Sequence, residues 1–125
     1  MELKGTAKLL RVFVGEGDKV RHTPLYEAIV REARAAGLAG ATAWTGMLGF
    51  GRTSRLRSGR ILDLSSNLSV VVELVDDAAK IEAFLPRLQA LFDAAGSGGL
   101  VTVEQVEIIR YLGGDKRGAD AGTGT

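Results

Sequence analysis

Cysteine is absent from this chain of 125 residues, and histidine occurs once, as His22. Without cysteine the chain can form no disulfide, thiolate nucleophile, cysteine-based zinc site or iron–sulfur cluster. A surplus of charge of one sign is missing too, because 16 Lys and Arg stand against 15 Asp and Glu, which gives a net charge of +1. No global field therefore attracts the protein to nucleic acid or to an anionic membrane, and any electrostatic attraction has to be local.

Long apolar runs and a signal peptide are also missing. Residues 1–8 lack the apolar core and the cleavage site of a secretory signal, so we expect a cytoplasmic protein without insertion into a membrane. The length suits one domain, which we place at residues 1–112. Residues 113–125 have no apolar side chain larger than alanine, and we expect them to be a disordered C-terminal tail.

The spacing of apolar residues predicts the element order. Alternation predicts strands at residues 8–14, 41–50, 68–75 and 100–111. Helical spacing predicts helices at 25–36, capped by Thr23 with Pro24 in the first turn, and at 81–95, capped by Asp76 or Asp77. Pro86 predicts a kink or a break in the second helix. The order β-α-β-β-α-β indicates an α+β, ferredoxin-like fold with one antiparallel sheet and both helices on one face.

The second face of this sheet needs a cover. Leu9, Phe13, Trp44, Val71 and Val101 are expected there, and one domain has only two helices. Because a monomer would expose a large apolar patch, we expect an oligomer that buries this face.

Residues 51–66 predict a long basic loop. Arg52, Arg55, Arg57 and Arg60 alternate with Thr, Ser and Gly, and no acidic residue follows until Asp63. Four arginines without a neighbouring acidic residue suit contact with a phosphate or an acidic partner, and a merely solvated loop is the alternative.

Two glycine clusters have a structural and a functional interpretation. Gly46, Gly49 and Gly51 resemble a phosphate-binding loop loosely and fit better a strand end with a bulge. Residues 96–99, Gly-Ser-Gly-Gly, fit a helix cap and turn, and alternatively a nest of backbone amides that faces an anion.

Aromatic residues and the lone histidine give weaker signals. His22 precedes a helix and fits an exposed loop residue better than a catalytic one, since no serine or carboxylate is spaced to form a triad with it. Trp44 and Tyr26 fit core or interface positions better than base-stacking platforms, because the strands around them are not basic. We therefore expect no metal site and no nucleic-acid partner.

Eight segments together resemble a known family. They are residues 10–16 (LRVFVGE), 24–30 (PLYEAIV), 37–43 (GLAGATA), 49–51 (GFG), 62–66 (LDLSS), 72–76 (VELVD), 84–86 (FLP) and 99–104 (GLVTVE). The set resembles the uncharacterised domain-of-unknown-function family 190, over about residues 8–112. Members are related to the PII-like (nitrogen regulatory protein-like) signal proteins. The resemblance implies a ferredoxin-like trimer whose strands form the inner core and whose clefts between subunits bind adenine nucleotides.

The resemblance also implies a set of ligand-binding residues. Gly49, Phe50, Gly51 and Arg52 would line one side of the cleft, and Gly98, Gly99 and Arg110 would line the other. The sequence departs from the PII pattern in three ways. Thr53 and Ser54 stand where PII proteins have Gln-Lys, the glycine turn lacks its lysine, and the basic loop has no tyrosine. These departures weigh against sensing of 2-oxoglutarate and against uridylylation.

The leading hypothesis is a PII-like regulatory protein that is not an enzyme and has no resident cofactor. An adenine nucleotide as effector would order the basic loop, and Arg55, Arg57 and Arg60 would dock on a partner; family analogy suggests a membrane transporter or a fluoride channel. One alternative is a small dimeric, oxygenase-like enzyme of the same fold that uses His22 or Trp44. Another is a ligand-free module whose loop binds only protein.

Overall fold

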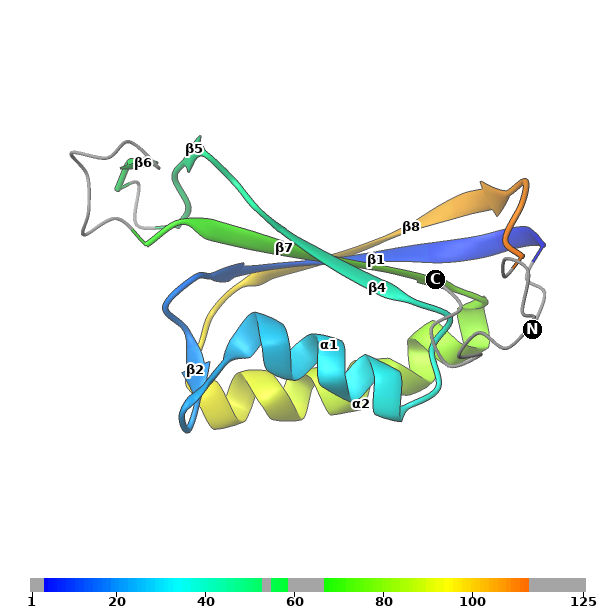
Figure 1. Cartoon of the computed structure of the whole chain (residues 1–125), viewed down its shortest axis with the longest axis horizontal. Coiled ribbons are helices and arrows are strands. Elements are labelled where there is room, and N and C mark those ends of the chain that lie inside the picture. The colour runs from blue at the N-terminus through cyan, green and yellow to red at the C-terminus, as the bar shows by residue number, and fades with distance from the viewer. Residues whose placement is uncertain (1–3, 53–54, 59–66, 113–125) are drawn as a thin grey trace, which may run out of the picture.

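The computed structural model describes residues 4–52, 55–58 and 67–112 (Figure 1). Four strands form one antiparallel sheet in the order β4-β7-β1-β8. These strands are β1 (Gly5–Gly15), β4 (Ala41–Thr45), β7 (Ser69–Asp76) and β8 (Leu100–Ile108), and the helices are α1 (Leu25–Ala35) and α2 (Ala78–Ala95). Two short ribbons pair β2 (Lys19–Val20) with β3 (Thr23–Pro24) and β5 (Leu48–Gly49) with β6 (Arg57–Ser58). The main sheet and the helices follow the order β-α-β-β-α-β, so the ferredoxin-like α+β fold is confirmed.

The core lies between the sheet and the two helices, which cover the same face (Figure 1). Leu10, Val12 and Val14 of β1 point into it, as their alternation predicts. The other core side chains come from β7 and from the inner faces of the helices: Val70, Val72, Leu74, Leu25, Ile29, Ala33, Ile81, Phe84, Leu88 and Phe92.

The face away from the helices, called the open face below, carries an apolar row that crosses all four strands. Trp44 pairs with Val71, Val71 with Phe13 and Phe13 with Leu100. The prediction that Val101 belongs to this face is wrong, because Val101 pairs with Val12 and so lies on the side of the helices. Leu100 takes its place. Alternation separates the two faces of a strand, but only the pairing register says which of them meets the helices.

The helix starts were predicted in part. Asp77 caps α2, since its Oδ1 accepts a hydrogen bond from the Lys80 N–H at 2.9 Å. Thr23 does not cap α1: it belongs to β3 and pairs with Val20, and α1 begins after Pro24 without a side-chain cap.

Pro86 does not break α2, which runs continuously from Ala78 to Ala95. The backbone hydrogen bond that Pro86 removes would have gone to the carbonyl of Glu82. Both residues are exposed, so water can solvate the freed carbonyl.

The predicted strand at 41–50 is two separate elements. β4 ends at Thr45, and β5 then leaves the main sheet to pair with β6 (Figure 1). The basic segment is therefore not a plain loop throughout, since Arg57 and Ser58 form a strand. The remainder of that segment at 53–54 and 59–66, which includes Arg60, and the predicted tail at 113–125 lie outside the described residues. Over the described part of the chain, neither helix has the length and apolar character that crossing a bilayer requires.

Candidate functional site

The first group of predicted ligand residues lies on the ribbon of β5 and β6. Leu48 pairs with Ser58 and Gly49 with Arg57, and the Gly46 N–H donates to the Ser69 carbonyl at 2.8 Å, which fixes the base of the ribbon to β7. The cavity that Gly49 lines at this base has about 10 Å³, room for no more than one water molecule. Phe50, Gly51 and Arg52 follow and are exposed.

The glycine turn at 96–99 is a helix end. Gly96 adopts φ 63°, its N–H donates to the Asp93 carbonyl, and the Ser97 N–H donates to the Phe92 carbonyl, each at 3.2 Å. These two amides serve the C-cap of α2. The cap interpretation is confirmed, and the amides of Gly98 and Gly99 are the ones that remain candidates for binding an anion.

Gly99 is glycine for a packing reason. Its φ is 88°, and a Cβ there would lie 2.6 Å from Phe92 Cε1 and 2.9 Å from the Phe13 carbonyl oxygen. The turn therefore approaches β1 more closely than any residue with a side chain allows.

Two side chains join the glycine turn to its neighbours. Asp18 Oδ2 accepts hydrogen bonds from the Ser97 hydroxyl at 2.7 Å and from the Gly15 N–H at 2.9 Å. Asn67, on the segment that enters β7, accepts from the Gly17 N–H at 2.6 Å. The turn after β1 thus connects the glycine turn with the segment that returns from the basic region. Sequence reasoning missed this junction, because its partners are 79 and 50 positions apart.

A groove of about 800 Å³ lies on the open face, toward the end where β8 finishes. This volume is within the range of small-molecule sites, about 300–1,000 Å³. The lining is apolar at Leu9, Val75, Val106, Ile108 and Ile109, and polar at Thr42, Glu73, Glu107, Arg110 and Tyr111. An apolar floor with a few polar groups at its rim suits a flat ring that carries polar substituents.

One wall of the groove is held by a buried carboxylate. Asp76 is fully buried; its Oδ2 accepts from the Ala39 N–H at 2.9 Å and its Oδ1 from the Asp77 N–H at 2.7 Å. The Ala39 carbonyl in turn accepts a hydrogen bond from the Tyr111 hydroxyl. Ala39 therefore connects the segment before β4 with two other parts of the chain by hydrogen bonds. One is Asp76, next to the start of α2, and the other is Tyr111, which follows Arg110 after β8.

The predicted site residues fall into two groups at different ends of the sheet. Gly98 and Gly99 precede Leu100, whereas Arg110 follows Ile108 at the other end of β8. Nine residues of strand separate these ends by roughly 30 Å. The ribbon lies at the same end as the glycine turn, beyond Thr45 and Val70, but next to the opposite edge strand. Within one chain, Arg110 is thus not brought together with the other predicted ligand residues.

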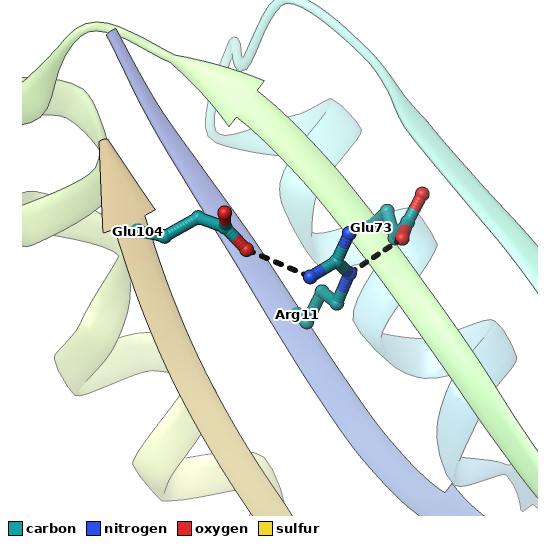
Figure 2. A network of polar contacts seen from close by, with 3 residues as sticks. All are labelled: Arg11, Glu73 and Glu104. Carbon is teal, nitrogen blue, oxygen red and sulfur yellow. Dashed lines mark hydrogen bonds and ion pairs between the residues drawn. The ribbon is translucent and has the colours of Figure 1, made fainter. Parts of the chain in front are cut away.

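Arg11 lies on β1 and belongs to the open face, next to the apolar row; Figure 2 shows it between Glu73 and Glu104. Its Nε donates to Glu73 and its Nη1 to Glu104, each at 2.7 Å. The hydrogen bond with Glu73, together with the charges of both carboxylates, raises the pKa of Arg11 above its ordinary value. Sequence reasoning gave Arg11 no role, and a cation flanked by the core residues Leu10 and Val12 was the available signal.

The residues of the enzyme alternative are not assembled into a site. His22 is exposed in the turn between β2 and β3, Trp44 lies in the apolar row, and neither lines the groove. Among the residues that the structure describes, no three His, Asp or Glu side chains gather as metal ligands would.

Comparison with known proteins decides the family. Residues 7–108 match DUF190, described as "Uncharacterized ACR, COG1993". The chain belongs to the DUF190 family. A UPF0166 protein of Aquifex aeolicus (strain VF5) is 37% identical over 105 residues, which cover 84% of this DUF190 chain and 94% of that protein. A UPF0166 protein of Methanocaldococcus jannaschii is 30% identical over 104 residues, or 83% and 93% of the two chains.

The fold of this DUF190 protein is similar to that of CPII from Thiomonas intermedia K12, a nitrogen regulatory PII-like protein. The TM-score is 0.60 at 18% identity, and the match covers 82% of this chain and 88% of CPII, in a structure of CPII bound to ADP and bicarbonate. The resemblance inferred from the eight sequence segments, to domain-of-unknown-function family 190, is confirmed, and the fold is similar to that of a PII-like protein. The ligand-binding and docking residues stay predictions.

Proposed function

We propose that this DUF190 protein is a cytoplasmic, trimeric, PII-like regulator that binds an adenine nucleotide in clefts between its subunits and is not an enzyme. The observation that carries the proposal is the division of the candidate site into two halves at different ends of the sheet. The groove with Arg110 forms one half. The glycine turn and the segment Gly49 to Arg52 form the other.

A neighbouring subunit can join the two halves. The apolar row on the open face supports such packing, since Trp44 is 50% exposed and Leu100 is 55% exposed. Large apolar side chains gathered on one face mark an interaction surface. Rotational packing of these faces would set the glycine turn and ribbon of one subunit beside the groove of the next.

The chemistry of the two halves suits a nucleotide. The apolar floor of the groove would hold the base, while Thr42 and Glu73 at its rim offer polar partners for the base or the ribose. Arg110, Arg52 and the amides of Gly98 and Gly99 would bind the phosphates, because guanidinium groups and backbone N–H groups are the usual phosphate ligands. CPII, a protein of this fold, binds ADP in its own structure, which supports this choice of ligand.

The basic segment is the proposed output of the regulator. A nucleotide phosphate that contacts Arg52 would order the residues after it, and Arg55, Arg57 and Arg60 would then dock on a partner. A membrane transporter or channel with an acidic surface is the kind of partner this cluster fits.

Titration calorimetry against ATP, ADP, AMP and cyclic AMP tests the proposal. We expect saturable binding of at least one nucleotide, weakened about tenfold or more in Arg110→Gln, which removes a charge-assisted phosphate contact. Gly98→Asp should weaken it similarly, because it adds an anion where nothing lies within 4 Å of the new Cβ. Arg34→Gln, at the exposed end of α1, is the matched control and should bind normally. No heat at millimolar concentrations of every nucleotide would overturn the proposal.

A further inference from the structure

The ribbon of residues 47–52 and 55–58 exposes four large apolar side chains to solvent. Met47 is 83% exposed, Phe50 70%, Leu48 66% and Leu56 63%. These are among the most exposed apolar residues of the described chain, and they lie on an element that projects beyond the helices and the main sheet (Figure 1). A cluster of this kind on a projecting element marks a binding surface.

The register of the ribbon sets apart an apolar and a cationic side chain. Leu48 pairs with Ser58, and Gly49 pairs with Arg57. Because side chains alternate along a strand, Leu48 and Arg57 point to opposite sides of the paired residues. Phe50, Arg55 and Leu56 lie directly beside the two strands. The ribbon therefore gathers exposed apolar side chains and arginines on one small element.

The charge of the ribbon is of one sign. Residues 46–62 contain no Asp or Glu, whereas the whole chain is almost balanced at +1. Arg52, Arg55 and Arg57 thus concentrate positive charge on an element that also exposes four large apolar side chains. Elements that lie at the surface of an anionic bilayer combine these properties: Leu and Phe enter the boundary of the acyl chains, and arginines on the polar face bind lipid phosphates.

From this combination we infer that the ribbon binds the surface of an anionic phospholipid bilayer. The exposed side chains of Leu48, Phe50 and Leu56 enter the interface, and the arginines contact headgroup phosphates. The protein lies on the membrane and does not span it. A lipid surface fits these side chains because positive charge together with exposed apolar area suffices for interfacial binding. The inference builds on the proposed role of the basic segment in docking, but it does not require nucleotide binding.

Co-sedimentation with vesicles, in the absence of nucleotide, tests this inference. We expect the protein to pellet with phosphatidylcholine vesicles that contain phosphatidylserine and to remain in solution with phosphatidylcholine alone. The double variant Leu48→Ser/Leu56→Ser should weaken binding more than tenfold, since it removes two of the four exposed apolar side chains of the ribbon. Arg57→Gln should weaken binding about fivefold, the effect of one basic residue near an anionic surface.

Two matched controls separate the ribbon from the rest of the surface. Leu112→Ser removes an apolar side chain that is 49% exposed outside the ribbon, and Arg34→Gln removes an exposed cation on α1; both should bind vesicles like the unaltered protein. Equal binding to neutral and anionic vesicles, or binding by Leu48→Ser/Leu56→Ser at full strength, would overturn the inference. So would no binding to any vesicle, which would leave the ribbon to a protein partner. Calorimetry with nucleotides on the same samples shows independently whether the proposed function holds.

Discussion

The carboxylate of Asp18 accepts a hydrogen bond from the hydroxyl of Ser97 at 2.7 Å, across 79 residues of sequence. The same oxygen accepts the Gly15 N–H, so one carboxylate closes the turn after β1 and holds the glycine turn against it. A charged acceptor in a partly buried position makes this a stronger contact than an ordinary surface hydrogen bond. The placement of Gly98 and Gly99 at the proposed cleft depends on it.

Loss of this contact should lower stability. We expect Ser97→Ala to reduce the free energy of unfolding by about 1–2 kcal/mol, since it leaves Asp18 with one fewer donor. In a double-mutant cycle with Asp18→Ala, the two effects should overlap by about 1 kcal/mol. Urea unfolding measures both quantities. Ser69→Ala, at an exposed position of β7, is the control. Strict additivity of the two variants would show that the contact contributes nothing.

Gly99 and Gly98 should respond differently to alanine. At Gly99, φ is 88° and the new Cβ would clash with Phe92 and the Phe13 carbonyl, so we expect a loss of about 2–4 kcal/mol. At Gly98 nothing lies within 4 Å of the Cβ, and the change should stay within about 0.5 kcal/mol. Thermal unfolding of the two variants side by side checks this. Similar melting temperatures would mean that the turn does not pack on β1 as described.

Asp76 should be sensitive to truncation. Asp76→Ala leaves the N–H groups of Ala39 and Asp77 without their acceptor inside the protein, so we expect a loss of about 2–4 kcal/mol in urea unfolding. Hydrogen exchange at the Ala39 amide should also accelerate, because Asp76→Ala removes the acceptor of its hydrogen bond. Glu82→Ala, on the exposed side of α2, should change stability by less than about 0.5 kcal/mol. An equally small effect at position 76 would contradict a supporting role for this carboxylate.

The apolar row predicts how assembly responds to charge. Trp44→Glu places a carboxylate at the β4 end of the apolar row, on the surface that the proposed trimer buries, at a cost of about 3–5 kcal/mol per interface. We expect light scattering to report a monomer for this variant and a trimer for the unaltered protein. Ala35→Glu, on the exposed side of α1, should remain trimeric. A trimer that survives Trp44→Glu would show that another surface makes the assembly.

Arg11 should contribute to stability independently of pH in the neutral range. Its pKa is raised, so the contribution of the charged guanidinium is fully present below the ordinary pKa of arginine and is lost only as the pH rises through the raised pKa, far above the neutral range. Arg11→Met removes the partner of Glu73 and Glu104 and should lower the urea midpoint by the same amount at pH 6 and pH 9. A difference between these two pH values would point to titration of another group.

Local sequence signals predicted most of the fold. The alternation of Leu10, Val12 and Val14 and the cap at Asp77 depend on neighbouring residues, and both are confirmed. Errors arose where a distant contact decides the outcome. Val101 was placed on the wrong face because pairing with Val12 sets the register. Thr23 failed as a cap because pairing with Val20 keeps it in a strand.

The candidate site was harder to predict than the fold. The glycine turn and the arginines are visible in the sequence, but the groove is built by residues of four strands and of the segments that flank them. No periodicity brings Ala39, Asp76 and Tyr111 together; their contacts depend on how the chain closes after β8. In the sequence, Gly99 and Arg110 flank the same predicted strand, and nothing there assigns them to different sites. Only the nine-residue length of β8 shows that Arg110 and Gly99 are far apart within one chain.

The position of Arg110 and Gly98 at different ends of β8 has a genetic consequence. In the trimer proposed above, a chain with a defective groove and a chain with a defective glycine turn would each bind no nucleotide when made alone. When both are made in one cell, subunits mix, and a cleft regains two intact halves wherever the right neighbours meet. Random mixing in equal amounts restores about one quarter of the clefts. Two inactive alleles would thus complement each other.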